Sequence, residues 1–144
     1  MPALNFHPRF EIPIREGWKR QTIRRRRQRA VQAGDLLTLF VGQRTAACRR
    51  ICPDVRCTDV LEIEIRFGDG GQIDRIVTDG IRVRDHDAFA LLDGFEDGND
   101  MAGFFRAVHG PLQVFDGIVI EWAMPRPVLA ASLGAGRAGL RRAA

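Results

Sequence analysis

The chain has 144 residues, of which 45% are hydrophobic, and it carries a net charge of +4. This length and composition fit one domain with one core and argue against a wholly disordered chain. No run approaches the roughly 20 apolar residues that span a bilayer, and residues 1–10 lack the apolar run of a signal peptide, so we expect a cytoplasmic protein without a membrane partner.

The charge is distributed unevenly along the chain. Residues 1–56 contain 13 basic and 4 acidic residues, whereas residues 57–124 contain 5 basic and 14 acidic residues. A strongly basic segment attracts anions and speeds their encounter with the protein. We therefore expect the N-terminal third to contact an anionic partner, either RNA or a nucleotide-like ligand.

The first half of the chain predicts mainly strands. In 57–67, apolar and charged side chains alternate from Glu62 to Phe67, the period of a half-exposed strand. The segment Gly68-Asp69-Gly70-Gly71 is typical of a hairpin turn. The predicted elements are an irregular or short helical approach at 6–18, a turn at 33–35, and strands at 36–41, 45–51, 57–67, 73–77 and 81–84.

Two helices and a closing strand are predicted later in the chain. Residues 85–87 can cap a helix through 88–92, and Gly94 ends it. Asn99 or Asp100 can cap a second helix, 101–108, with an apolar face formed by Met101, Phe104, Phe105 and Val108. An apolar strand follows at 114–122.

This order of elements predicts an α+β fold. We expect a small closed or nearly closed β-barrel with two or three helices packed at its opening. Residues 1–124 form this domain, and the Ala/Gly/Arg-rich tail at 125–144 is expected to be disordered.

The cysteines do not predict a metal centre. Cys48, Cys52 and Cys57 have the spacing C-x3-C-x4-C, which differs from the paired C-x2-C of a zinc ribbon. A zinc site would need a fourth ligand such as His7 or His86, or else His109, so we expect thiols on strands instead. No phosphate-binding glycine motif occurs, and no cofactor is expected.

Lys19 is the only lysine in the protein. A lysine amine can lose its proton and act as a base, whereas arginine stays charged. Thr22 lies three residues further on, and its hydroxyl needs an adjacent base to act as a nucleophile. Burial beside Trp18 can lower the pKa of Lys19, and Arg24 can hold an anion or an oxyanion.

Three segments of the chain resemble the ASCH domain, a protein family related to the PUA domain. The resemblance is to the ASCH proteins carried by phages and prophages in particular. The three segments are G-W-K-R-Q-T-I-R at 17–24, A-G-D-L-L-T-L-F-V-G-Q-R-T-A-A-C-R-R-I at 33–51, and F-A-L-L-D-G-F-E-D-G-N-D-M-A-G-F-F at 89–105. The likeness covers roughly residues 6–122. It implies a PUA-like β-barrel with a cleft and an association with RNA.

The resemblance also implies a candidate catalytic set. Some ASCH members are amidohydrolases that remove acetyl from N4-acetylcytidine, using a lysine, a threonine and a glutamate before the last helix. By motif position, Lys19 and Thr22 match the first two residues. For the third, residue type favours Glu96, whereas distance from the helix favours Asp97.

Three functions remain open. The first is an RNA-binding module, with Trp18 and Phe40 as stacking surfaces. The second is the amidohydrolase implied by the resemblance, and the third is a ribonuclease, since other ASCH members are described as such and His7 could move protons. The residues expected to contact RNA or a modified nucleoside are Trp18, Arg20, Arg24, Arg25, Arg26, Arg27 and Arg44.

Overall fold

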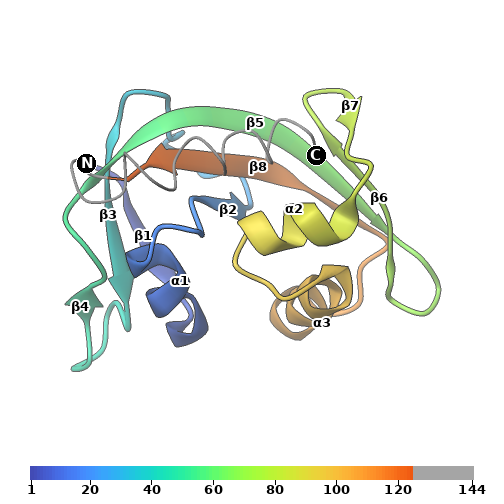
Figure 1. Ribbon diagram of the computed structural model, residues 1–144, viewed down its shortest axis with the longest axis horizontal. Coiled ribbons are helices and arrows are strands. Elements are labelled where there is room, and N and C mark those ends of the chain that lie inside the picture. Colours follow the sequence, from blue (N-terminus) through green and yellow to red (C-terminus); the bar gives the residue numbers. More distant parts are fainter. Residues whose placement is uncertain (125–144) are drawn as a thin grey trace.

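The computed structural model describes residues 1–124, and the tail predicted at 125–144 lies outside the described residues. The fold is α+β, as predicted (Figure 1). The strands are β1 (Ala3–Phe6), β2 (Gln21–Arg24), β3 (Leu36–Val41), β4 (Arg49–Arg50), β5 (Val55–Phe67), β6 (Ile73–Thr78), β7 (Ile81–Arg82) and β8 (Val114–Ala123). The helices are the 3-10 helix η1 (Pro8–Phe10) and the α-helices α1 (Glu11–Arg15), α2 (His86–Leu92) and α3 (Gly98–His109).

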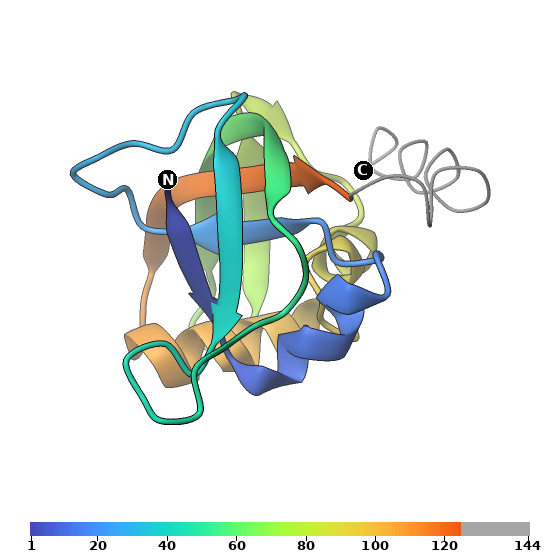
Figure 2. The ribbon, with the colours of Figure 1, turned by 90° about the vertical axis from the view of Figure 1, so that its left-hand side faces the viewer.

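The long strand β5 organises the sheet. It pairs antiparallel with β3, β6 and β8, and β8 pairs in turn with β2. At the other side, β1 pairs with β3 in a parallel register. Figure 2 shows β1 beside β3, with β2 running across behind them.

The sheet is not closed among the described residues, so the predicted barrel is not confirmed. β1 pairs only with β3, and β2 pairs only with β8, which leaves a seam between β1 and β2. A side chain bridges this seam, since Nη2 of Arg24 donates a hydrogen bond to the backbone oxygen of Asn5 at 2.7 Å. Polar groups therefore lie at this seam.

The helices cover one side of the sheet (Figure 1). Met101 and Phe105 of α3 are buried, and the Phe105 ring meets the Phe115 ring of β8 edge-on at 5.0 Å between centroids. Strand β8 is buried on both faces, since Val119 and Ile120 are both inaccessible to solvent. No helix of the described residues is long and apolar enough to cross a membrane.

Several local predictions are confirmed. Strand β3 has the predicted bounds, and β5 begins two residues earlier than predicted, at Val55. Helix α2 is capped by Asp85, whose carboxylate accepts a hydrogen bond from the backbone N–H of Ala88. A short side-chain acceptor at this position satisfies an N–H that the helix cannot.

Three details differ from prediction. The cap of α3 is Asp97, because its extended backbone lets Oδ1 accept from the N–H of Asp100 at 2.8 Å. Val108 is 56% exposed, because its turn of the helix presents His109 rather than Val108 to the Phe105 and Phe115 rings. The strand predicted at 45–51 is only β4, because the Thr45 hydroxyl bonds the backbone of Gly42 and Ala47 in a turn.

Candidate functional site at the seam

Lys19 lies between α1 and β2, with a side chain that is only 1% exposed. The chain turns back after α1 because the N–H groups of Trp18 and Lys19 both donate to the carbonyl of Pro13. Gly17, at φ +89°, provides the left-handed residue that this return requires. The turn directs the lysine inward instead of along the edge of the sheet.

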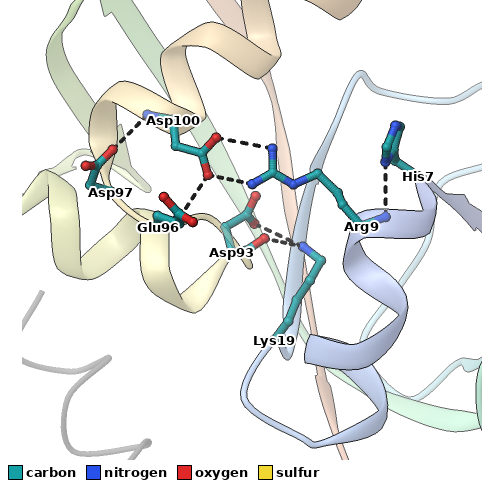
Figure 3. A network of polar contacts seen from close by, with 7 residues as sticks. All are labelled: His7, Arg9, Lys19, Asp93, Glu96, Asp97 and Asp100. Atoms are coloured by element: carbon teal, nitrogen blue, oxygen red, sulfur yellow. Dashed lines mark hydrogen bonds and ion pairs between the residues drawn. The ribbon is translucent and has the colours of Figure 1, made fainter.

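The Lys19 ammonium is held by oxygen atoms of Gln21 and Asp93, and Figure 3 shows its contacts with Asp93. Its Nζ donates to the backbone oxygens of Gln21 at 2.7 Å and Asp93 at 2.5 Å. The carboxylate Oδ1 of Asp93 lies 3.8 Å from the same nitrogen. Asp93 itself is buried, and its Oδ1 also accepts from Nε2 of Gln21 at 3.3 Å.

Aromatic rings complete the surroundings of the amine. Nζ of Lys19 lies 4.6 Å from the Phe10 ring centroid and 5.6 Å from that of Phe6. Burial penalises the charged form and lowers the pKa of Lys19 to about 8, although the Asp93 carboxylate opposes this shift. Burial likewise raises the pKa of Asp93 to about 6, against the opposing effect of Lys19. Burial thus shifts the pKa values of both groups toward neutrality.

Gly94 allows Lys19 and Asp93 to meet. It follows the end of α2 with φ +95°, a conformation that side chains rarely adopt. A Cβ atom at this position would lie 2.7 Å from Cδ of Lys19 and 2.9 Å from Cδ1 of Phe10. Glycine is thus required both by the backbone conformation and by the closeness of the lysine stem.

Thr22 and Arg24 share one face of β2, because side chains two positions apart on a strand point to the same side. Nε of Arg24 donates to Oγ1 of Thr22 at 3.2 Å, and the Arg24 guanidinium lies 4.8 Å from the Phe6 ring centroid. Phe6 is therefore close to both the Arg24 and the Lys19 cation. No hydrogen bond joins Lys19 and Thr22 within residues 1–124. Burial lowers the pKa of Arg24 to about 10.

Glu96 and Asp97, the two predicted third members, lie outside this cluster. The carboxylate of Asp97 caps α3, and the Glu96 side chain is exposed. Arg9 donates to both carboxylate oxygens of Asp100, and the Glu96 backbone N–H donates to the same carboxylate (Figure 3). The carboxylate beside Lys19 is that of Asp93, which the sequence interpretation missed. The adjacent Asp93 and Gly94, in the third of the segments that resemble the ASCH domain, were the feature of the sequence that could have pointed to this carboxylate.

The predicted basic contacts divide into two groups. The Arg26 guanidinium forms ion pairs with Glu62 and Asp116, so acids of the sheet already compensate its charge. Arg25 lies over the Phe115 ring at 4.6 Å, and Arg27 is exposed without an ion pair to any residue of 1–124. The basic run is therefore only partly available to phosphate groups.

The other predicted contact residues lie around the cluster or away from it. Trp18 is half-buried and donates through Nε1 to Glu16 at 3.2 Å. Arg20 is half-buried, and Phe40 on β3 is half-buried as well. Arg44 is exposed in the turn after β3, at φ +69°.

The cysteines are free thiols whose exposure differs along the chain. Cys48 is exposed, Cys52 is half-buried and Cys57 is buried. Within residues 1–124, no group of three or more His, Cys, Asp or Glu side chains is arranged to hold a metal ion.

Comparison with protein-family models, curated proteins and solved structures finds no match to this chain.

Proposed function

We propose that the protein is an ASCH-type amidohydrolase that removes the acyl group from a modified nucleoside such as N4-acetylcytidine. The observation that carries the proposal is the placement of the Lys19 amine, buried and 3.8 Å from the Asp93 carboxylate, next to the strand that bears Thr22. Perturbed titratable groups with a specific charge partner are typical of catalytic sites. A base with a pKa near the working pH transfers protons efficiently.

In the proposed reaction, the Thr22 oxygen adds to the acyl carbon while its proton passes to the neutral Lys19 amine. The tetrahedral oxyanion is stabilised by Arg24, which already donates to the Thr22 hydroxyl. The C–N bond then breaks, and the Lys19 proton moves to the leaving amino group of the base. Water then adds to the acyl-threonine while Lys19 accepts a proton from it, and the acyl–oxygen bond breaks as Lys19 returns that proton to the Thr22 oxygen, which releases the carboxylic acid and restores the free hydroxyl and the neutral amine.

Asp93 takes the role of the third residue in this proposal. Its carboxylate orients the Lys19 amine and stabilises the ammonium form that arises when the base accepts a proton. The proposal extends to the fold: we interpret the open sheet as a PUA-like barrel whose seam between β1 and β2 admits the substrate. The interpretation of the seam as an opening is supported by the positions of β1 and β2, each of which pairs with only one other strand.

Chromatography of nucleosides tests the proposal. The wild type and the Lys19→Arg and Thr22→Val variants are incubated with N4-acetylcytidine, and cytidine is measured. We expect cytidine from the wild type and a loss of about 100-fold or more in both variants, since arginine cannot act as a base and valine lacks the hydroxyl. An active Lys19→Arg variant would exclude the role of the lysine.

RNA binding is the second candidate function. The observation that favours it is the pair of cations on the basic run, Arg25 and Arg27, which form no ion pair within residues 1–124. These side chains can contact phosphate groups of a single strand. No comparable observation favours a ribonuclease, because His7, His86 and His109 belong to three different elements or their caps.

A further inference from the structure

A cleft lies away from the Lys19 site. It has a volume of about 690 Å³ and is bounded by the β5–β6 hairpin, β7, α3 and the segment that leads into β8. None of Lys19, Thr22, Arg24 or Asp93 lines it. The part of the chain that forms this cleft, after residue 56, is the acidic part.

Basic residues nevertheless converge on this cleft. Residues 57–124 contain only 5 basic residues, and all except Arg84 line the cleft. The four that line it are Arg66, Arg75, Arg82 and Arg106. Because they come from two strands of the hairpin, from β7 and from α3, their meeting is a product of the fold and not of a local basic run.

Three of these arginines lack a compensating acid. Arg75, Arg82 and Arg106 are exposed and form no ion pair within residues 1–124, whereas Arg66 is paired with Glu64 at 3.0 Å. Arg75 lies directly opposite Arg66 in the antiparallel register, an arrangement of like charges that costs stability. Two aspartates, Asp69 and Asp74, also line the cleft, so the four arginines leave it with a positive balance.

An aromatic ring borders the same space. Phe67 is half-buried in the cleft wall and packs against Phe105 at 6.2 Å between ring centroids. Nearby, Gln113 is exposed and can both donate and accept hydrogen bonds. Cations next to a ring and an amide provide what a nucleotide requires: charge for its phosphate, a stacking surface and polar contacts for its base.

We propose that this cleft binds a nucleotide unit, with its phosphate on Arg75, Arg82 and Arg106 and its base against Phe67. The site is separate from the proposed amidohydrolase chemistry and does not depend on it. The same phosphate chemistry is offered by a free mononucleotide and by one unit of an RNA strand, and binding measurements with both distinguish these two sources.

The test uses an Arg82→Gln/Arg106→Gln double variant, with Arg84→Gln as the matched control. Arg84 is also exposed and comes from the same segment, but it does not line the cleft. Binding of uridine 5′-monophosphate, inorganic phosphate and single-stranded oligouridine is measured by NMR titration, followed through the Gln113 amide. We expect the double variant to lose affinity by about tenfold or more, while the control stays within about twofold of the wild type.

The pattern across the probes identifies the ligand. Equal losses for the mononucleotide and the oligonucleotide assign the cleft to one nucleotide unit, and a loss for the oligonucleotide alone assigns it to a strand. Equal affinity of the double variant and the wild type for every probe, or no shift at Gln113 in the wild type, overturns the inference. Hydrolysis of N4-acetylcytidine is assayed on the same variants and is expected to be unchanged, so failure of either proposal can be recognised separately.

Discussion

The Lys19 ammonium and the Asp93 carboxylate lie 3.8 Å apart in the interior, although 74 positions separate the two residues in the chain. Moving both charges out of water is costly, and their attraction repays that cost only while both partners are present. The ion pair is therefore not a strong argument for a contribution to the stability of the fold. Its position beside the seam between β1 and β2 favours a catalytic role instead.

Removing the lysine alone strengthens the dependence of stability on the titration of Asp93. In Lys19→Met, Asp93 loses the charge that lowers its pKa, so its folded pKa rises further above the value of the unfolded chain. Stability then falls as pH increases through this window, because the unfolded chain releases the proton before the folded one does. We expect a loss of about 3–5 kcal/mol at pH 8 and a smaller loss at pH 5, measured by urea unfolding. The Lys19→Met/Asp93→Asn double variant, which buries no lone charge, serves as the control. Equal losses of the single variant at the two pH values would contradict the burial of an uncompensated carboxylate.

Changing Asp93 shifts the titration of Lys19. The Asp93 carboxylate raises the pKa of Lys19 from the lower value that burial alone would impose. In Asp93→Asn, the midpoint of the rise of kcat/KM with pH is therefore expected to move below about 8. A midpoint that stays in place or moves to higher pH would show that the carboxylate does not act on this amine.

Gly94→Ala is expected to destabilise the protein by about 1–3 kcal/mol, because the new Cβ meets Lys19 and Phe10 and because φ is positive. Gly103, on the exposed side of α3, is the control, since a Cβ atom added there would have no neighbour within 4 Å. Gly103→Ala is expected to leave stability unchanged or increase it by up to about 1 kcal/mol. Thermal unfolding of both variants measures the difference, and a harmless Gly94→Ala would refute the close packing.

The two kinds of arginine in the basic run are expected to differ in RNA binding. For single strands, each neutralised phosphate contributes about 0.7 to the slope of log K against log salt concentration. Arg27→Gln should lower this slope by about 0.7, whereas Arg26→Gln, whose side chain is held by Glu62 and Asp116, should leave it unchanged. Equal effects of the two variants would show that the ion pairs open on binding.

Local patterns in the sequence predicted much of the fold. A short apolar run located β3, alternating side chains located β5, and the short acidic residue Asp85 marked the start of α2. Strand β1 was missed because four residues shortly before a proline are too few to show the alternation of side chains that indicates a strand. Strand β2 was missed because its polar sequence becomes a strand only through pairing with β8.

The candidate site was also predicted only in part, because some of its contacts depend on tertiary packing. Lys19 stood out by its chemistry and its uniqueness in the chain. Asp93 did not, since its contact with Lys19 depends on where α2 ends and on the conformation of Gly94, which are properties of the packed structure. The cleft at Arg75, Arg82 and Arg106 was hidden because its cations are scattered through an acidic segment.

The pH dependence of N4-acetylcytidine hydrolysis tests most directly whether a neutral Lys19 amine acts as the base, which is the central claim. We expect kcat/KM of the wild type to rise with pH and to level off above about 8, where Lys19 loses its proton. A rate that is independent of pH across this range, or that falls through it, would contradict the role of Lys19 as the base.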